Sequence, residues 1–460
     1  MSNIFSTPLR LNLRLTLSLI LCFNFVYPQA ENILGDINND EIVDILDLVS
    51  CVNMIIDPTN NLTEYETWAS DVNNDEFTNV LDLVITVNFV LGNLQQACII
   101  ENEIFVPCYA DYTGCCYPTT SHEFTWEFYE FGEPGSHIND LAVINENNIW
   151  AAGLFKEIDT TTWDGYHRYN LAHWDGVEWE LIDLSLPFIP NGVTDTSWYV
   201  FETQMIHAIN ENDIWIQNHD RSFGHWDGME WTGYFWAQIA IKHKAWSTSS
   251  ESVWFSGHGG VHYYDGIQFQ EQISFWINHR LTDIWGISED RIWTTGYQVE
   301  PSETILLEFD GTEWFIKNTS DGTEPCGTSF LCGFTGAVWA FGDTLYVSSA
   351  QNGIWHESIS TGSGWLMEDP AEFVWGSWMG LRGNHYNDIF HFSEGCHFYH
   401  YNGIDWEYSD ALIAPYTEEG WPYAPHQYSV YVNGDFIVLG GKAPAGNGSK
   451  AWVAKGYRNQ

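Results

Sequence analysis

The stretch Asn148-Ile149-Trp150-Ala151-Ala152-Gly153, followed by Trp174-Asp175-Gly176-Val177-Glu178-Trp179, sets the pattern that decides the fold. Its first half is a short apolar run that ends in Trp before small residues. Its second half is an aromatic-Asp-Gly turn with another aromatic residue three positions after the glycine. Asp-Gly between apolar runs is typical of tight hairpins. The pattern therefore predicts antiparallel strands joined by short turns.

Both halves of this pattern recur along the chain. The first half returns at Asp213-Ile214-Trp215, Ser252-Val253-Trp254 and Arg291-Ile292-Trp293, and the second begins again at Trp226, Tyr264, Phe309 and Tyr401. Weaker copies lie around residues 338–365, 375–390 and 430–452, which makes seven units of about 48 residues, between the periods typical of propeller repeats. Each unit reads as a four-stranded antiparallel meander. The sequence thus predicts a mostly β fold that resembles a seven-bladed β-propeller over residues 123–460.

The two ends of this region complement each other. The last unit ends near Tyr457 without its aromatic-Asp-Gly strand, and Thr125-Trp126-Glu127-Phe128 resembles the missing outer strand. We expect the strand near residues 125–128 to complete the seventh blade and so remove the open edges of the ring. An open solenoid of the same repeats is the alternative.

A second duplication, at an offset of 35 residues, lies near the N-terminus. Each copy places oxygen-bearing side chains at loop positions 1, 3, 5, 9 and 12 and a main-chain carbonyl at position 7, as a hard cation with six to eight oxygen ligands requires. The predicted calcium ligands are Asp36, Asn38, Asp40, Ile42, Asp44 and Asp47 in the first loop, and Asp71, Asn73, Asp75, Phe77, Asn79 and Asp82 in the second. The alternative is a pair of acidic turns that only cap helices.

Each loop leads into the same helical pattern, Leu-Val-x-x-Val-Asn, at residues 48–53 and 83–88. Together with Asp at position 12, these features resemble a type I dockerin domain. The resemblance implies a small α-helical, EF-hand-like domain over residues 31–98 that holds two Ca²⁺ ions and binds a cohesin module of a scaffold or surface protein. It also implies partner-binding residues at loop positions 10 and 11, although the two leucines could instead pack the small core; these residues are Ile45, Leu46, Val80 and Leu81.

One departure from the calcium-loop pattern concerns its sixth position. Calcium loops prefer glycine there because its backbone adopts positive φ without strain. Glu41 and Glu76 stand at that position here. We therefore expect some backbone strain and weaker calcium binding.

The first thirty residues predict export. Arg10 and Arg14 precede an apolar run from Leu15 to Val26, and Ala30 follows at a suitable distance for cleavage, which is the pattern of a secretory signal peptide over residues 1–30. A membrane anchor is the alternative, but the run is shorter than the ~20 residues that a spanning helix needs. We expect a secreted protein, extracellular or at the cell surface, with no membrane insertion after the signal is removed.

The cysteines favour disulfide bonds. Of nine cysteines, Cys22 lies in the signal peptide, which leaves an even number in an exported chain. Cys326 can close a small loop with Cys332, and Cys108 can pair with Cys115 or Cys116 within a cysteine-containing linker over residues 99–122. A zinc site is the alternative, but no two cysteines have the two-residue gap that such sites favour.

Composition excludes some classes of partner. The chain carries 15 Lys and Arg against 62 Asp and Glu, a formal charge of −47, which opposes binding to nucleic acid. An apolar fraction of 45% is too high for a disordered acidic chain. The acidity therefore belongs to the surface of a folded protein.

Residues that every repeat shares are expected to pack the blades, so function should lie where the repeat is broken. The recurring histidines His173, His225, His262 and His400 are accordingly expected to be structural. The insertion from residue 411 to 426 offers side chains for stacking on a ligand, and the ligand-loop candidates are Tyr416, Trp421, Tyr423 and His426.

These features favour a secreted, non-catalytic interaction protein: a calcium-dependent dockerin that tethers a β-propeller platform, with a polysaccharide as one candidate ligand. No nucleophile elbow, His-Glu-x-x-His helix or phosphate loop is present in the sequence, and the catalytic residues of any activity stay unknown. One alternative is a hydrolase acting on O-glycosyl bonds in polysaccharide breakdown. Another is a structural surface or adhesion component.

Overall fold

The computed structural model describes most of residues 120–459 and shorter stretches before them. The described ranges are 35–39, 43, 45–56, 63–72, 78–79, 82–83, 86–87, 99–100, 103–104, 120–189, 195–218, 222–235, 242–274, 279–298, 303–320, 335–349, 353–362, 364–368, 380–393, 395–418, 425–445 and 448–459. The chain forms two compact units, Met1–Pro118 and Thr119–Gln460. The predicted signal peptide lies outside the described residues. Within the described ranges, no helix has both the length and the apolarity to cross a membrane.

The first unit contains two short helices, α1 (Ile45–Ile56) and α2 (Glu64–Ser70), and a pair of two-residue strands, β1 (Ile99–Ile100) and β2 (Glu103–Ile104). A capping box begins α2: the Glu66 amide donates to Thr63 Oγ1 (3.1 Å), and the Thr63 amide donates to Glu66 Oε2 (2.7 Å). Helix α1 buries one side, and the small core contains Ile37, Cys51, Met54 and Ala69.

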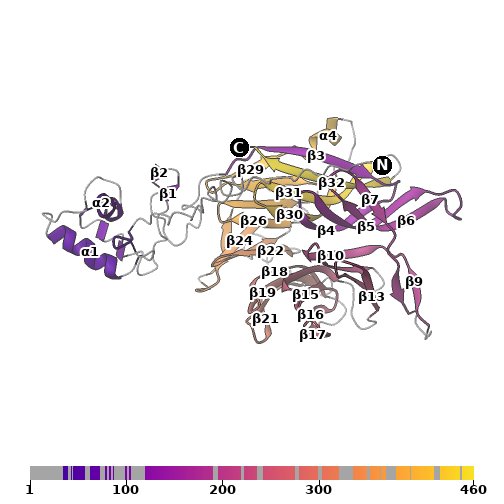
Figure 1. Ribbon diagram of the computed structural model, residues 1–460, viewed down its shortest axis with the longest axis horizontal. Helices are drawn as coiled ribbons and strands as arrows, with labels where there is room; N and C mark the ends of the chain where they lie inside the picture. Colours follow the sequence, from indigo (N-terminus) through magenta and orange to yellow (C-terminus); the bar gives the residue numbers. More distant parts are fainter. Residues whose placement is uncertain are drawn as a thin grey trace, which may run out of the picture. The chain divides into compact units, whose positions relative to one another are not determined.

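The second unit is a ring of seven four-stranded antiparallel sheets, so the predicted fold class is confirmed. Figure 1 shows its strands coloured along the sequence. The first three blades are β4 (His137–Asn145), β5 (Asn148–Ile158), β6 (Tyr166–Trp174) and β7 (Trp179–Ile182); β10 (Thr203–Asn210), β11 (Asp213–Asn218), β12 (Ser222–Trp226) and β13 (Trp231–Phe235); β14 (Lys242–Ser249), β15 (Ser252–Gly257), β16 (Gly260–Tyr264) and β17 (Phe269–Ser274). Between the first two blades, β8 (Leu186–Phe188) and β9 (Ser197–Tyr199) form a separate ribbon.

The remaining four blades follow in chain order. They are β18 (His279–Ser288), β19 (Arg291–Gln298), β20 (Glu303–Phe309) and β21 (Trp314–Ser320); β22 (Thr335–Phe341), β23 (Thr344–Ser349), β24 (Gly353–Ser358) and β25 (Leu366–Glu368); β26 (Gly380–His385), β27 (Asp388–Ser393), β28 (His397–Tyr401) and β29 (Trp406–Ser409); β30 (His426–Asn433), β31 (Phe436–Ala445), β32 (Gly448–Arg458) and β3 (Phe124–Phe131). A short helix, α4 (Ala414–Glu418), lies between the last two blades in the chain.

The first strand of each blade is its inner strand and contacts the first strand of the next blade. These contacts run from β4 through β10, β14, β18, β22 and β26 to β30, and β30 contacts β4 again, so the ring is closed. Strand β3 comes from the start of the unit and pairs with β32 from Phe124–Arg458 to Phe131–Ala451. The seventh blade therefore joins the two ends of the chain segment that forms the ring.

The aromatic-Asp-Gly turns join the third and fourth strands of their blades. In the first blade, Asp175 Oδ1 accepts hydrogen bonds from the amides of Val177 (2.8 Å) and Glu178 (2.9 Å), and Gly176 has a φ of +95°. A short polar side chain that binds its own turn, followed by glycine at positive φ, explains this choice of residues. The same side-chain bonds recur at Asp227, Asp265, Asp310 and Asn402.

The recurring tryptophans lie in the core between blades. Trp215 is 1% exposed, and its ring lies 6.0 Å from the ring of Phe255 in the next blade. Trp254 repeats this arrangement against Phe309, at 4.8 Å. Burial of such large rings between adjacent sheets supplies much of the apolar surface that stabilises the ring.

Two of the nine cysteines lie in the described part of the chain. Cys51 and Cys396 are both buried, and neither forms a disulfide. Burial, followed by the charge of Asp82, raises the pKa of Cys51 to about 11, so its thiol is inert at neutral pH. The predicted pairs among Cys108, Cys115, Cys116, Cys326 and Cys332 fall outside the described residues and stay predictions.

Candidate functional site

A cavity of about 530 Å³ opens at the end of the propeller channel where the inner strands begin. All seven inner strands contribute to its wall, together with β19, β31 and β32. The lining residues are His137, Asn139, Gln204, His243, Lys244, Arg280, Thr282, Asp283, Tyr297, Gly336, Gly380, Arg382, Tyr428, Ser429, Val430, Lys442 and Ser449. Its volume is in the range of small-molecule sites.

The cavity wall reverses the charge balance of the chain. The sequence has 15 Lys and Arg against 62 Asp and Glu, yet the described lining residues include four of these cations and one carboxylate, Asp283. The four cations are Lys244, Arg280, Arg382 and Lys442. A cationic cavity in a strongly acidic protein is a local feature that the net charge conceals.

Two of the four cations belong to ion pairs that cross the channel. Arg382 in the sixth blade donates from both terminal nitrogens to Asp283 in the fourth, at 2.8 Å each. Asp283 also accepts from the Val338 amide in the fifth blade at 3.1 Å, so one carboxylate joins three blades. The Arg382 guanidinium lies 5.0 Å from the ring of Trp285, which adds a cation–π contact.

The same arrangement is duplicated on the other side of the ring. Asp140 in the first blade accepts from the Ile206 amide in the second (3.1 Å) and is paired with Lys244 in the third. Ser429 in the seventh blade donates to the same carboxylate at 2.8 Å. Asp140 and Asp283 each stand at a β-bulge of their inner strand, which directs the side chain toward the next blade. These pairs are therefore part of the framework.

Arg280 and Lys442 have no such partner. The structure gives neither of them an ion pair with any described residue. Arg280 is exposed, at the beginning of β18. Lys442 on β31 lies with its ammonium 5.5 Å from the ring of Tyr428. Two uncompensated cations thus face a cavity whose other charges are neutralised in pairs.

The neighbourhood of Arg280 is itself cationic. Burial lowers the pKa of His243 to about 3, and the surrounding positive groups act in the same direction. Those groups are His258, Lys244, Lys242 and Arg280. Lys242 is fully buried and donates to the carbonyls of His258 (3.1 Å) and Gly260 (2.8 Å), and its burial lowers its pKa to about 7.

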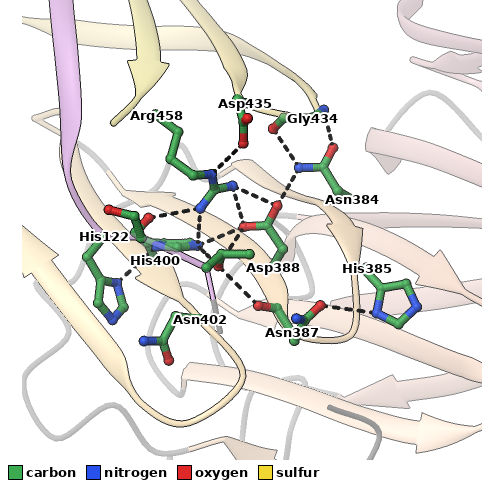
Figure 2. Close-up of polar contacts among 12 residues, drawn as sticks. His122, Asn384, His385, Asn387, Asp388, His400, Asn402, Gly434, Asp435 and Arg458 are labelled. Atoms are coloured by element: carbon green, nitrogen blue, oxygen red, sulfur yellow. Dashed lines mark hydrogen bonds and ion pairs between the residues drawn. The ribbon is translucent and has the colours of Figure 1, made fainter. Parts of the chain in front are cut away.

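A second polar cluster, drawn in Figure 2, lies where the sixth and seventh blades meet. Arg458 Nη2 donates to both oxygens of Asp388 (2.6 and 2.7 Å), and His400 Nε2 lies 2.8 Å from the same carboxylate. Although burial alone would raise the pKa of Asp388, the His400 hydrogen bond and the Arg458 charge lower it. Asn384 also donates to this carboxylate (2.5 Å) and accepts from the Gly434 amide (2.7 Å). The cluster joins two blades, and Asp388 at its centre accepts hydrogen bonds from Arg458 and Asn384 beside His400.

The recurring histidines act in a similar way within single blades. His225 Nε2 lies 2.8 Å from Asp213 Oδ1 on the neighbouring strand, and its ring stacks on Trp215 at 4.1 Å. His173 repeats this with Asn148 (3.0 Å) and Trp150 (4.2 Å). These contacts tie the second strand of a blade to the third.

The described calcium-loop positions contain buried carboxylates. Asp36, Asp47 and Asp82 are at most 1% exposed, whereas Asn38 is exposed and Asp71 and Asn79 are half-buried. Asp47 Oδ1 accepts from the amides of Ile37 (2.8 Å) and Asn38 (3.0 Å), which closes the loop onto the start of α1. The other predicted ligands lie outside the described residues: Asp40, Ile42, Asp44, Asn73, Asp75 and Phe77. Among the described positions alone, no three His, Cys, Asp or Glu side chains form a metal-binding group.

The part of the sequence that surrounds these carboxylates has no cationic side chain. Between Arg14 and His122 the chain contains no Lys, Arg or His. Buried carboxylates are costly unless they are paired or bind a metal ion. The donor set therefore fits a divalent cation.

The predicted partner-binding residues that are described lie on the surface. Ile45 is 64% exposed and Leu46 is 55% exposed, both in the first turn of α1, so Leu46 does not pack the small core. Val80 and Leu81 lie outside the described residues.

Tyr416, predicted from the sequence to stack on a ligand, is buried. Tyr416 is 7% exposed, packs in a core cluster with Phe392 and Leu412, and donates to Glu130 Oε1 at 2.9 Å. Burial and this hydrogen bond raise the pKa of Tyr416. His426 begins β30 and pairs with Lys442 in the sheet. Trp421 and Tyr423 fall outside the described residues. The ring of Tyr416 thus packs the protein interior.

Comparisons with known proteins agree with these two units. Residues 34–91 match the family model of the dockerin type I domain. No curated protein matches the chain. The structure of YCF48 bound to D1 peptide is 13% identical, covers 74% of this chain and 100% of that one, and has a TM-score of 0.50.

Two further solved structures are the WD40 β-propeller domain of Doa1 (8% identity, 74% and 98% coverage, TM-score 0.44) and the computationally designed Ika8 protein (11% identity, 72% and 98% coverage, TM-score 0.41). Of these three structures, only that of YCF48 reaches a TM-score of 0.50, and at 13% identity it shows a likeness of fold alone. The chain therefore carries a type I dockerin domain at residues 34–91 and a seven-bladed β-propeller after it.

Proposed function

We propose that this chain is a secreted, non-catalytic binding protein. Its dockerin domain holds two Ca²⁺ ions and binds a cohesin-like module of a scaffold or surface protein, which places the chain outside the cell or at its surface. Its propeller is the cargo of this tether and presents a ligand-binding platform, with carbohydrate as the expected class of ligand.

The observation that carries the tether is the dockerin match over residues 34–91 together with the buried carboxylates in its loops. With no protein cation in this part of the sequence, calcium bound at the predicted ligands supplies the missing positive charge. Glu41 and Glu76 in place of glycine favour a modest calcium affinity.

The surface of α1 supports a docking role. Ile45, Leu46 and Val49 are all more than half exposed on the first two turns of the helix. Exposed aliphatic side chains that adjoin one another suit a partner that buries them in an interface.

The charge state of the cavity supports a binding role rather than hydrolysis of a glycosidic bond. Glycoside hydrolases use two carboxyl groups beside the scissile bond. The carboxylate in the lining, Asp283, is held in a bidentate pair with Arg382. Assaying the supernatant for released sugars, with the protein added to insoluble polysaccharides, tests this half of the proposal, since release would establish the hydrolase alternative.

The tether is tested by calorimetric titration of the full chain with a panel of type I cohesin modules, in calcium and in a chelator. We expect a module that binds only with calcium. Leu46→Asp should weaken that binding, whereas Ile56→Asp, at a 75% exposed position at the far end of the same helix, should not. Binding that survives the chelator, or that both variants reduce equally, would refute the assignment.

A further inference from the structure

We infer that the cavity at the end of the propeller channel binds an acidic oligosaccharide, with carboxylate groups of the sugar paired to Arg280 and Lys442. This inference rests on the proposed role of the propeller as a binding platform, and it names the site and the charge of the ligand.

The first step is the charge that remains after internal pairing. Arg382 is neutralised by Asp283, and Lys244 by Asp140. Arg280 and Lys442 are left with positive charge and no ion pair in the described part of the protein. They stand on the fourth and seventh blades, three blades apart around the ring. Because both line the same cavity, one ligand can contact both.

The second step concerns the field at the cavity. The Debye length at physiological salt is about 8 Å, so the many surface carboxylates are largely screened from a ligand inside the channel. Walls of lower dielectric constant strengthen the local charges. Burial is the main cause of the lowered pKa of His243, and the positive charges of Lys244, Lys242 and Arg280 lower it further. An anion entering this end of the channel is therefore attracted despite the overall charge of −47.

The third step concerns the rest of the wall, which selects between classes of anion. Among the described lining residues, five carry a neutral amide or aliphatic hydroxyl group, Asn139, Gln204, Thr282, Ser429 and Ser449, while Val430 is the sole branched aliphatic side chain. Peptide ligands gain most of their affinity from apolar or aromatic anchors in complementary pockets. A wall of hydrogen-bonding groups instead suits a polyhydroxylated ligand.

Two tyrosines, Tyr297 and Tyr428, complete the wall. Tyrosine combines an aromatic face with a hydrogen-bonding hydroxyl, which suits the mixed apolar and polar faces of a sugar ring. A cavity of about 530 Å³ has room for a short oligosaccharide.

The test is isothermal titration calorimetry of the full chain at constant calcium, with trigalacturonate as the acidic probe, galactotriose as its neutral counterpart and hexaglutamate as an acidic peptide. The variants are Arg280→Gln and Lys442→Gln. The matched control is Arg168→Gln, which removes the same charge on β6, outside the cavity wall.

We expect trigalacturonate to bind at least tenfold more tightly than galactotriose, and its affinity to fall as salt is added. Each cavity variant should lose about tenfold or more in affinity, the usual effect of one charged hydrogen bond, and Arg168→Gln should lose none. Thermal unfolding of each variant checks that the fold is kept.

Several results would overturn the inference: no binding of trigalacturonate, equal affinity for galactotriose, or an affinity unchanged in both cavity variants. Tighter binding of hexaglutamate would assign the cavity to acidic peptides instead. If galactotriose binds with the same affinity in the Arg280→Gln and Lys442→Gln variants as in the unchanged chain, this site is refuted, but the propeller is still a binding platform. Cohesin binding, measured on the same preparations, tests the tether separately.

Discussion

Replacing Asp283 by Asn should destabilise the propeller strongly, because its carboxylate joins three blades. The change removes the charge that accepts two hydrogen bonds from Arg382 and one from the Val338 amide. It leaves the Arg382 guanidinium, whose side chain is 15% exposed, without its counter-charge. Removing one partner of a buried ion pair costs about 3–5 kcal/mol.

The expected change in melting temperature follows from the size of the unit. At about 2.1 cal/mol/K per residue, the unfolding entropy of a ring of this length is about 0.7 kcal/mol/K, so the loss corresponds to about 4–7 °C. Scanning calorimetry and urea unfolding of the chain from residue 119 to 460 would measure it. The Arg382→Met variant and the double variant complete a double-mutant cycle.

The cycle separates an ion pair from a general packing defect. If the guanidinium is stranded by Asp283→Asn, then Arg382→Met in that background should recover part of the lost stability, because no unpaired charge remains. A loss below about 1 kcal/mol for Asp283→Asn, or additive effects of the two substitutions, would refute the argument that this pair holds the ring together.

Three further predictions concern pH, ring closure and calcium. Burial lowers the pKa of His391 to about 3, so below pH 6.5 the unfolded chain binds a proton at this site that the folded chain does not bind. As the pH falls from 6.5 toward 3, this site should reduce the free energy of unfolding by about 1.4 kcal/mol per pH unit. Burial also lowers the pKa values of His243 and His262 to about 3, so His391→Phe should remove only its own share of the slope of urea-unfolding stability against pH. An unchanged slope would contradict the assignment. A chain that begins at residue 132 lacks β3 and exposes the edge of β32, so light scattering should show aggregation that a chain beginning at residue 119 does not show, and equal solubility would argue against closure by β3. Chelating calcium should raise amide hydrogen exchange in α1 and α2 while leaving the blades protected, and protection unchanged in both helices would show that the loops need no metal.

The repeat could be predicted from the sequence because its signals are local. An Asp175-Gly176 turn carries its own hydrogen bonds and backbone requirement, so the residues that form it lie within a few positions of one another. The predicted burial of repeated residues follows from the same periodicity, as Trp215 and Trp254 show. The two predicted calcium loops could likewise be recognised, because their oxygen-bearing side chains are spaced within twelve residues.

The cavity could not be predicted in this way because its wall is assembled from all seven blades. Arg280 and Lys442 stand in different repeats, and nothing in the spacing between them indicates that ring closure brings them to one cavity. The one local signal is Lys242-His243-Lys244, a concentration of positive and titratable groups in a chain that has few. Tyr416 shows the converse: it lies in an insertion, but β3 brings Glu130 to its hydroxyl and the ring is buried.

Lys and Arg are few in this protein and carboxylates are many, so a cation without a carboxylate partner needs an explanation. Outside the cavity, five of the eight Lys and Arg side chains in the described blades lie beside carboxylates, among them Arg291 with Glu308 and Arg458 with Asp388. Lys317 even bridges two, Glu308 and Glu357. With 62 acidic residues in the sequence, pairing with a carboxylate is the commoner result for a cation in the described blades. The cavity contains both situations, since two of its cations are bound into the framework and two are not. A cation that only stabilised the ring would be expected to be bonded as Arg382 is to Asp283, or as the buried Lys242 is to the His258 and Gly260 carbonyls. Arg280 and Lys442 have no carboxylate partner among the described residues, and both line the cavity. A negatively charged ligand in the cavity would supply that partner.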